Sequence, residues 1–358
     1  MEIPPLFLFE IIIFNGYKYI TYMYALQYVF LTLGGITFFL LGLKFMSDNM
    51  EKLAGKKMEK VLSAFTKNRC AGVLTGAIST AVLQSSIATN VILVGFVSSG
   101  ILSFYSASAV VMGANIGTTI TAQLVSLSGS SAFDITAFGG VIAFIGFILS
   151  FFKNEKYNLI GGVMAGFGML FFGLNVVSDS IAYFKNFEAF RNIFTVKNHL
   201  LLLLNGLAIT AIIQSSSAVT SVMIILASNG LLTFESSMFL ILGANIGTCI
   251  CVILSAMNKP VDARRSAFFN IFFNTFGSII LFLPLTIFSS EIAGAFANFS
   301  GGIERQIANF HTLFNVFVTI ILLPVLKPVT NLVCLIVNDE RAKKVKNRAI
   351  KGVKVAKT

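Results

Sequence analysis

Two short clusters of neutral polar residues lie inside otherwise apolar sequence. The first is Gln84-Ser85-Ser86, and the second is Gln214-Ser215-Ser216-Ser217. Their amide and hydroxyl groups can donate hydrogen bonds to an anion and can also offer oxygen atoms to a small hard cation. From residue 71 to residue 133 the chain contains no Asp, Glu, Lys or Arg. The pattern therefore indicates that uncharged groups bind ions in an apolar medium.

A second motif follows each cluster in the same register. Gly-Ala-Asn-Ile-Gly-Thr occupies residues 113–118 and again residues 243–248. Both motifs recur at the same separation, from 84 to 214 and from 113 to 243. Two motifs that share one separation predict an internal duplication.

The composition places this duplication in a membrane. The chain of 358 residues is 56% hydrophobic and 11% charged, holds 37 Phe and has a mean hydropathy of +0.86. A soluble protein of this length could not bury so much apolar surface, so we expect an integral membrane protein that has membrane lipids as partners. The net charge of +11 does not indicate nucleic acid, because 8 of the 26 Lys and Arg lie at 341–358 and most others lie between apolar runs.

The hydropathy predicts helices that cross the membrane and helices that do not. In residues 71–100 the central polar cluster leaves two apolar arms, each too short to cross a hydrocarbon core of about 30 Å. A single long span is possible, but a re-entrant hairpin fits better, and its irregular tip must be buried in protein or face a water-filled cavity. We predict a second hairpin at 200–230, interrupted spans at 104–127 and 236–257, and uninterrupted spans at 26–46, 133–152, 159–177, 266–288 and 307–337.

These elements define an all-α, polytopic membrane protein with five parts. They are an N-terminal peripheral segment at 1–25, a first transmembrane repeat at 26–157, a second at 158–288, a linker with the final transmembrane helix at 289–337, and a basic cytoplasmic tail at 338–358. Each repeat contains a re-entrant hairpin with the Gln-Ser-Ser motif and an interrupted span. Residues 1–24 lack the charged start and the cleavage site of a secretory signal, so we expect no cleavage there.

The count of crossings predicts that the two repeats have inverted topology. Three crossings in the first repeat make the second begin on the opposite side. Five basic residues fall on one side, and the remaining Lys and Arg fall on the other; the five are Lys18, Lys185, Arg191, Lys197 and Arg305. By the positive-inside rule the C-terminus is cytoplasmic. Hairpins that crossed fully would give the same assignment, so the charges do not prove re-entry.

Several other polar residues have structural interpretations that we favour over functional ones. Asp48 and Asp179 end equivalent spans, where helix capping is favoured over ion coordination. The pairs Asn270/Asn274 and His311/Asn315 share helix faces at i and i+4, which favours hydrogen bonds between helices; His311 could alternatively sense protons. The four cysteines, Cys70, Cys249, Cys251 and Cys334, lack the neighbouring ligands of a metal site, and we expect buried thiols.

Taken together, the motifs resemble the type II sodium/phosphate cotransporter family in a bacterial form. The resemblance rests on the duplicated motifs, on Gly-Leu-Lys-Phe-Met-Ser-Asp at 42–48 and on His-Thr-Leu-Phe-Asn at 311–315, and it covers about residues 30–335. It implies an inverted-repeat fold in the bacterial cytoplasmic (inner) membrane, with inorganic phosphate and sodium ions held between the tips of the two hairpins. No metal other than sodium is implied.

The motifs also assign candidate site residues. For phosphate they are Gln84, Ser85, Ser86, Gln214, Ser215 and Ser216. For sodium, the coupling ion, they are Ser85, Thr89, Asn90, Asn115, Thr118, Thr119, Ser215, Ser217, Thr220, Asn245 and Thr248. The halves differ, since Ile87 stands opposite Ser217 and Asn90 opposite Thr220. Some bacterial relatives carry a C-terminal signalling domain, whereas here a basic tail follows, so a separate cytoplasmic phosphate-signalling regulator is the expected partner if there is one.

The predicted function is sodium-coupled symport of inorganic phosphate by alternating access. A transporter of another oxyanion such as sulfate is an alternative, and an ion channel is a further one. The protein is not expected to be an enzyme: an intramembrane serine hydrolase would need a base, and no His, Lys or Asp stands beside the serines. The direction of transport and the number of sodium ions are left open.

Overall fold

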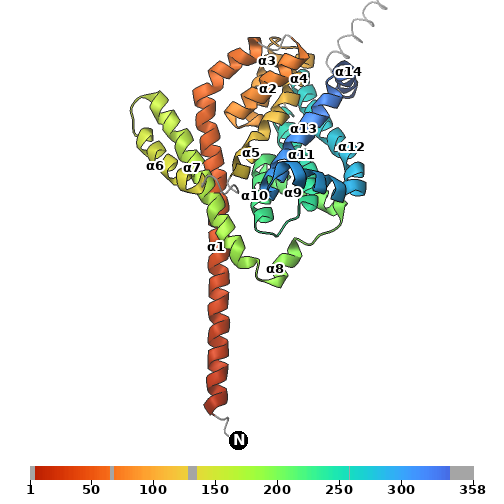
Figure 1. Ribbon diagram of the computed structural model, residues 1–358. Coiled ribbons are helices and arrows are strands. Elements are labelled where there is room, and N and C mark those ends of the chain that lie inside the picture. Colours follow the sequence, from red (N-terminus) through yellow and green to blue (C-terminus); the bar gives the residue numbers. More distant parts are fainter. Residues whose placement is uncertain (1–4, 65–67, 128–134, 258, 339–358) are drawn as a thin grey trace, which may run out of the picture.

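The computed structural model describes residues 5–64, 68–127, 135–257 and 259–338, and these residues form helices and no strand (Figure 1). The helices are α1 (Pro5–Ala64), α2 (Arg69–Leu83), α3 (Ser86–Ser98), α4 (Phe104–Thr118), α5 (Ile120–Ser126), α6 (Ile135–Ser150), α7 (Glu155–Phe184), α8 (Glu188–Ile193), α9 (His199–Ile213), α10 (Ser216–Ser228), α11 (Phe234–Ala256), α12 (Val261–Ser300), α13 (Ile303–Leu322) and α14 (Leu326–Ile336).

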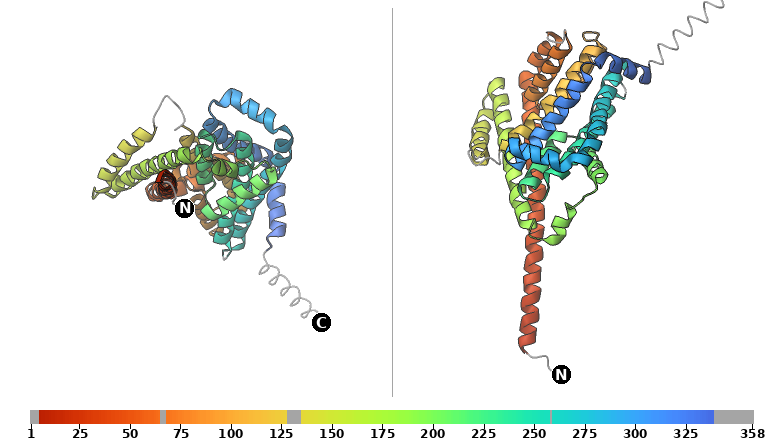
Figure 2. Two further views of the ribbon diagram at one scale, coloured as in Figure 1. Left: turned by 90° about the horizontal axis from the view of Figure 1, so that it is seen from below. Right: turned by 45° about the vertical axis from the view of Figure 1, so that its right-hand side comes forward.

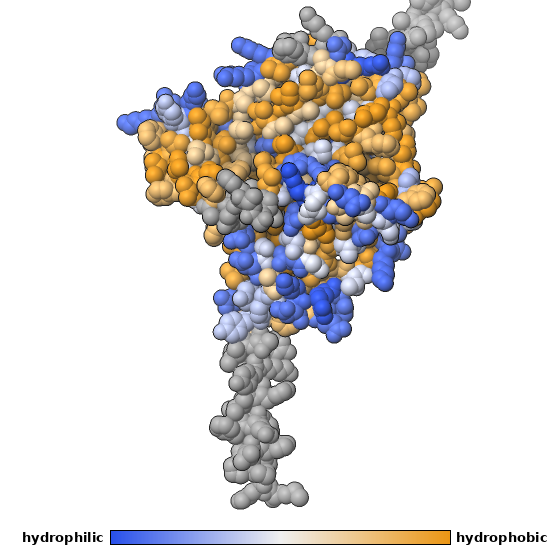
Figure 3. All heavy atoms as spheres, viewed as in Figure 1, coloured by the Kyte–Doolittle hydropathy of each residue, from blue (hydrophilic) through white to orange (hydrophobic). Residues whose placement is uncertain are grey.

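Several of these helices are long and apolar enough to cross a bilayer. Within the described residues, five stretches qualify: Met23–Ser63, Phe104–Ser126, Glu155–Phe184, Phe234–Leu254 and Val261–Ser300. The bent pair α13 and α14 qualifies as one further span. An apolar band with hydrophilic residues at both ends crosses the face of the molecule seen in Figure 3. The fold is therefore that of a multi-pass α-helical membrane protein.

Helices α1, α6 and α7 form a group beside the remaining helices. In both views of Figure 2, α6 and α7 lie to one side, and α7 packs along α1 and α6. Glycines allow the close approach of α1 and α7: a Cβ on Gly35 would lie 2.9 Å from the Gly173 carbonyl oxygen, and one on Gly42 would lie 2.7 Å from the Gly166 carbonyl oxygen. Small residues at crossings of this kind stabilise helix association in membranes through backbone contact.

The same glycine packing occurs twice in the other group. A Cβ on Gly76 would overlap the Val110 carbonyl oxygen where α2 packs on α4. At the equivalent position of the second copy, a Cβ on Gly206 would overlap the Leu240 carbonyl oxygen where α9 packs on α11. The glycines of the second motif, Gly113, Gly117, Gly243 and Gly247, meet backbone atoms of α2 and α9 in the same way. These four glycines therefore have a packing role.

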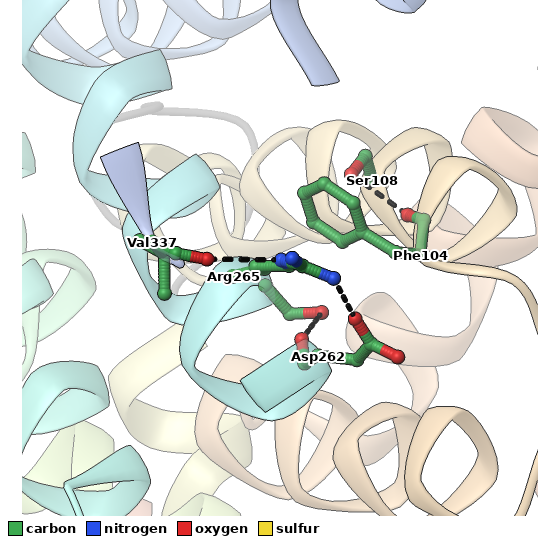
Figure 4. A network of polar contacts seen from close by, with 6 residues as sticks. Phe104, Ser108, Asp262, Arg265 and Val337 are labelled. Atoms are coloured by element: carbon green, nitrogen blue, oxygen red, sulfur yellow. Dashed lines mark hydrogen bonds and ion pairs between the residues drawn. The ribbon is translucent and has the colours of Figure 1, made fainter. Parts of the chain in front are cut away.

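Two basic side chains bind free carbonyl groups at one end of the molecule. Arg69 Nη1 donates to the carbonyl oxygens of Leu323 and Pro324, at 3.1 and 3.3 Å, where α13 ends. Arg265 donates to the Val337 carbonyl oxygen at 3.2 Å and pairs with Asp262 at 2.7 Å (Figure 4). Guanidinium groups that donate to the last carbonyls of a helix stabilise its C-terminus.

Helix boundaries differ from the sequence expectation in several places. α1 continues through residues 25 and 47 because the polar residues there do not break a helix, so the separate segment at 1–25 and the span end at 46 are not helix boundaries. Asp48 and Asp179 consequently lie within α1 and α7, and helix capping by these residues was a wrong prediction. Whether residues 1–25 lie peripherally stays a prediction, and residues 339–358 of the tail lie outside the described residues.

The later spans also depart from the prediction. α11 runs through residues 243–248 without the expected interruption, because its glycines serve close packing. α12 extends to Ser300 with a non-helical residue at Phe288, shortly after Pro284. The predicted final span bends by 89° between α13 and α14. The bend occurs at Pro324, because proline has no backbone N–H to donate to the helix.

Two smaller expectations also need correction. At 16 residues, α6 is shorter than the predicted span at 133–152, of which residues 133 and 134 lie outside the description. Cys70 is exposed and Cys334 half-buried, so the prediction of buried thiols was wrong for these two.

Candidate ion-binding site

Each Gln-Ser-Ser cluster forms a break between two helices. α2 ends before Gln84 and α3 begins after Ser85, whose hydroxyl accepts from the Ala88 amide at 3.1 Å. The second cluster repeats this geometry between α9 and α10, where Ser215 accepts from the Ala218 amide at 3.2 Å. Ser and Thr are favoured at such N-cap positions because the hydroxyl satisfies a free backbone amide. Each break therefore brings the C-terminus of one helix next to the N-terminus of the following helix.

Both breaks use a glutamine in a strained backbone conformation. Gln84 and Gln214 have φ of 54° and 64°, and they are the described residues other than glycine with positive φ. Glycine would adopt this conformation at lower cost, so the presence of Gln indicates that its side chain is needed. The Gln84 amide oxygen accepts from the Thr121 hydroxyl at 2.7 Å, and its amide nitrogen donates to the Ala81 carbonyl at 2.6 Å.

The two breaks meet at one cavity of about 440 Å³. In Figure 1 the hairpin of α2 and α3 lies near the top, and α9 and α10 lie below it. The cavity is lined by Leu40, Leu43, Lys44, Ser47, Asp48, Gln84, Ser85, Ser86, Ile87, Gly117, Thr118, Thr121, Ile213, Gln214, Ser215, Ser216, Ser217 and Thr248. The cavity therefore joins the two copies of the motif, which are far apart in the sequence.

The cavity combines groups suited to an anion with groups suited to a cation. The N-termini of α3 and α10 begin at Ser86 and Ser216, and amides at a helix N-terminus attract anions. The C-termini of α2 and α9 end at the same breaks, where carbonyl oxygens carry the opposite partial charge. Ser216 and Ser217 are buried, and the Ser215 and Ser217 hydroxyls lie 3.2 Å apart.

Nine of the predicted site residues line the cavity, namely Gln84, Ser85, Ser86, Thr118, Gln214, Ser215, Ser216, Ser217 and Thr248. Six do not, namely Thr89, Asn90, Asn115, Thr119, Thr220 and Asn245. Among the six, Asn115 donates to the Asn270 amide oxygen at 2.8 Å, and Thr119 accepts from the Thr312 hydroxyl at 3.0 Å. These contacts join helices.

Of the later Asn and His residues, Asn270, Asn274 and His311 form hydrogen bonds between helices, as the sequence predicted, whereas Asn315 donates to the His311 carbonyl at 2.9 Å within α13. His311 Nε2 lies 3.1 Å from the Asn245 amide oxygen, which links α13 to α11. Asn274 approaches the Asn115 amide oxygen at 3.4 Å, which links α12 to α4. His311 is buried and does not line the cavity.

Four polar residues of the cavity wall were not assigned to the site from the sequence, three on α1 and one on α5, although ion coordination by Asp48 was considered as the less favoured alternative. Lys44, Ser47 and Asp48 come from α1, and Thr121 comes from α5. The Ser47 hydroxyl donates to the Leu83 carbonyl at 3.1 Å, which fixes α1 beside the end of α2. The motif at 42–48 marked this stretch in the sequence, but its packing against the first break could not be read from it.

The fold and the cavity define a multi-pass membrane protein with a cavity at which the ends of four helices meet. The sequence profile of the Na+/Pi-cotransporter family matches residues 38–179 and 185–300. This match covers well over half of the chain, so the protein belongs to that family.

Comparison with curated proteins gives relatives along most of the chain. A Bacillus subtilis protein, "Uncharacterized protein YqeW", is 30% identical over 293 residues, which are 81% of this chain and 92% of the relative. The Escherichia coli protein "Putative inorganic phosphate export protein YjbB" is 25% identical over 86% of this chain, which spans only 55% of that relative's length. The mouse "Sodium-dependent phosphate transport protein 2B" is 36% identical over 124 residues, 33% of this chain and 18% of the relative. No solved structure matches.

Proposed function

We propose that this protein is a secondary transporter that moves inorganic phosphate with sodium across the membrane by alternating access. The observation that carries the proposal is the single cavity at which both Gln-Ser-Ser breaks, two helix N-termini and two helix C-termini meet. Membership of the Na+/Pi-cotransporter family supports both the substrate and the coupling ion.

Phosphate would be held by uncharged donors in the cavity. We assign to it Gln84, Ser85, Ser86, Gln214, Ser215 and Ser216, which all line the cavity. Burying an anion within the membrane without a compensating positive charge would cost several kcal/mol. Sodium bound beside it offsets this charge, so each ion makes the binding of the other more favourable.

Sodium would be held by hydroxyl and carbonyl oxygens of the same cavity. Of the predicted ligands, Ser85, Thr118, Ser215, Ser217 and Thr248 line it. The Thr118 and Thr248 hydroxyls donate to the Ala114 and Ala244 carbonyls, each at 3.0 Å, which leaves their lone pairs available to a cation. For the six predicted residues outside the lining we propose no direct contact with sodium in this conformation.

Inverted repeats would supply the two-sided access that a transporter needs. In support, the breaks of both hairpins line one cavity, and α2 and α3 lie above α9 and α10 in Figure 1. The contacts between α1 and α7 are also reciprocal: Gly35 meets Gly173, and Gly42 meets Gly166. The separation from 35 to 166 equals that from 42 to 173, so each contact maps onto the other. Transporters of this plan bind substrate where the repeats meet.

The proposed location is the bacterial cytoplasmic membrane, with the C-terminus in the cytoplasm. In support, Arg69 and Arg265 donate to carbonyl groups at the ends of α13 and α14, and Figure 1 shows α14 near the top of the molecule and α8 well below it. The end that is richer in Lys and Arg faces the cytoplasm under the positive-inside rule. A separate phosphate-signalling regulator on that side stays a prediction.

Export is a second candidate direction, because the E. coli relative is named as a putative phosphate exporter. Sulfate is the alternative substrate. Monohydrogen phosphate can donate a hydrogen bond and sulfate cannot, so the amide oxygens of Gln84 and Gln214 would favour phosphate if they accept from it. A channel is the remaining alternative, and saturable binding that depends on sodium would argue against one.

Equilibrium binding to the purified protein in detergent tests this proposal independently of direction. Radioactive phosphate is titrated in sodium buffer and in potassium buffer of the same ionic strength, with sulfate as competitor. We expect phosphate binding that is at least tenfold tighter in sodium and that sulfate does not displace. Equal phosphate affinity in the two buffers would contradict sodium coupling. Displacement of bound phosphate by an equal concentration of sulfate would show that phosphate is not the preferred substrate.

A further inference from the structure

Two charged side chains of α1 stand at the wall of the cavity. Lys44 and Asp48 are one helical turn apart, and both line it together with the two Gln-Ser-Ser breaks. They lie within the apolar stretch Met23–Ser63. The salt bridge recorded among the described residues joins Arg265 to Asp262, so Lys44 and Asp48 do not pair with each other. No other charged residue belongs to the cavity lining.

A charged residue within a membrane span is costly unless it faces water or a partner. The side chains of Lys44 and Asp48 are exposed, and the neighbouring Ser47 donates to Leu83, directly before Gln84. Lys44 thus belongs to the same cavity wall as the first break, at which α3 begins. A cation in this position attracts an anion that enters the cavity.

The second copy of this stretch differs in charge and in position. In the register that relates residue 42 to residue 173, the counterparts are Asn175 for Lys44 and Asp179 for Asp48. Neither lines the cavity. Ser178, the counterpart of Ser47, accepts from the Asn229 amide at 3.0 Å, at the far end of α10 from the break. The cavity is therefore flanked by α1 on one side, and α7 does not occupy the equivalent place in this conformation.

We propose that Lys44 is an anion-binding residue that acts on one face of the membrane only. It draws inorganic phosphate to the cavity in the conformation in which α1 stands beside the Gln84 break. In the opposite conformation α7 takes the equivalent place beside the Gln214 break and presents the neutral Asn175. This inference rests on the proposed function and adds a difference in phosphate attraction between the two faces of the membrane.

Phosphate influx measured from each membrane face tests the asymmetry. Right-side-out and inside-out vesicles are given the same inward sodium gradient, and initial uptake is measured against phosphate concentration for wild type and Lys44→Asn. We expect the half-saturating phosphate concentration to rise about tenfold on one face. The increase should shrink at high ionic strength, because salt screens an exposed charge. The other face should be unchanged, which also shows that the variant is folded.

Two further variants sharpen the test. Lys52→Asn makes the same change on an exposed residue of α1 outside the cavity lining and should leave both faces unchanged. Asn175→Lys should lower the half-saturating phosphate concentration on the opposite face. Equal effects of Lys44→Asn on both faces, or no effect on either, would overturn the inference while wild-type uptake still supports the proposed function. Absence of sodium-dependent uptake in the wild type would instead overturn the function itself.

Discussion

At the level of single residues, the two breaks place neutral polar side chains at helix ends beside the cavity. Gln84 and Gln214 hold left-handed backbone at the two breaks, and Ser85 and Ser215 cap the helices that follow. Left-handed backbone costs a residue with a side chain roughly 1–2 kcal/mol. Both breaks carry this cost, and from it we draw the hypothesis that the glutamine amide groups take part in binding.

Replacing Gln84 by glycine should separate backbone strain from side-chain chemistry. Glycine relieves the left-handed strain, so thermal unfolding of Gln84→Gly in detergent should occur at the wild-type temperature or above it. Phosphate binding should nevertheless weaken strongly, because the amide is lost. Gln84→Ala removes the same amide but keeps the strain, and it serves as the comparison. Wild-type phosphate affinity in both variants would show that the Gln84 side chain has no part in binding.

Hydroxyl deletion at the two helix N-termini should affect binding more than stability. In Ser86→Ala or Ser216→Ala, the bound phosphate loses the hydroxyl that we propose as its hydrogen-bond partner. The cost is about 1–3 kcal/mol, which corresponds to a loss of up to roughly a hundredfold in phosphate affinity. Ser228→Ala, at the other end of α10 and outside the cavity, is the matched control. Isothermal titration calorimetry measures the phosphate affinity of each variant. Equal affinities for all three variants would show that Ser86 and Ser216 do not bind phosphate.

Ser217 has no hydroxyl counterpart, since Ile87 occupies its place in the first copy. Its side chain is buried and lies 3.2 Å from the Ser215 hydroxyl. We therefore expect Ser217→Ala to raise the sodium concentration needed for half-maximal phosphate binding, with little change at saturating sodium. An unchanged sodium dependence would contradict its role as a sodium ligand.

The sequence shows the duplicated motifs, but it does not show which residues pack beside them in the fold. Gln84 and Gln214 could be predicted because the duplication marks them. Asn115 and Asn245 share a duplicated motif too, yet they form hydrogen bonds with Asn270 and His311 away from the cavity lining. Lys44 could not be placed, because linear spacing does not show which helix packs beside the break.

At the level of helices, backbone contact at glycines holds the hairpins against their neighbouring spans. Period and composition predicted most helices of this protein. They failed at α1, where polar residues inside a long helix look like boundaries, and at α11, where a Gly-rich motif looks like an interruption. At α1 the polar residues do not break the helix, and at α11 tertiary packing of the glycines decides the outcome, which a single sequence does not show.

Gly243→Ala tests the packing role of this motif. The added methyl group would overlap the Leu203 carbonyl oxygen and lie 2.7 Å from the Leu207 amide, so α9 must move away from α11. We expect a loss of about 1–3 kcal/mol in stability, measured as a lower unfolding temperature in detergent. Gly95→Ala is the control, since nothing lies within 4 Å of its Cβ position and Ala favours the helix. If Gly243→Ala unfolds at the same temperature as the wild type, the packing role of Gly243 is contradicted.

At the level of the whole molecule, α1 and the two helix breaks line one cavity, an arrangement that the proposed alternating access would use. α1 contacts the hairpin group through Ser47 and Leu83, and α7 contacts it through Ser178 and Asn229. Movement of one group against the other could exchange these two contacts. The two contacts are not equivalent in this conformation, because Leu83 lies directly before the first break and Asn229 lies at the far end of α10 from the second.

Single cysteines at the exposed N-caps Ser103 and Thr233 test the inverted topology. These residues follow α3 and α10, at the mouths of the two hairpins. In a background without other cysteines, a membrane-impermeant maleimide should label position 103 from the cytoplasmic face and position 233 from the outer face. Labelling of both positions from the same face would contradict the inverted arrangement.

Phosphate flux into liposomes that contain only the purified protein tests the central claim most directly. Uptake of radioactive phosphate is measured under a sodium gradient, a potassium gradient or a pH gradient alone, with protein-free liposomes as control. The account predicts saturable accumulation above the external phosphate concentration with the sodium gradient, and none with the other two. Flux that is indifferent to sodium, or that never exceeds equilibration with the external phosphate concentration, would contradict sodium-coupled transport.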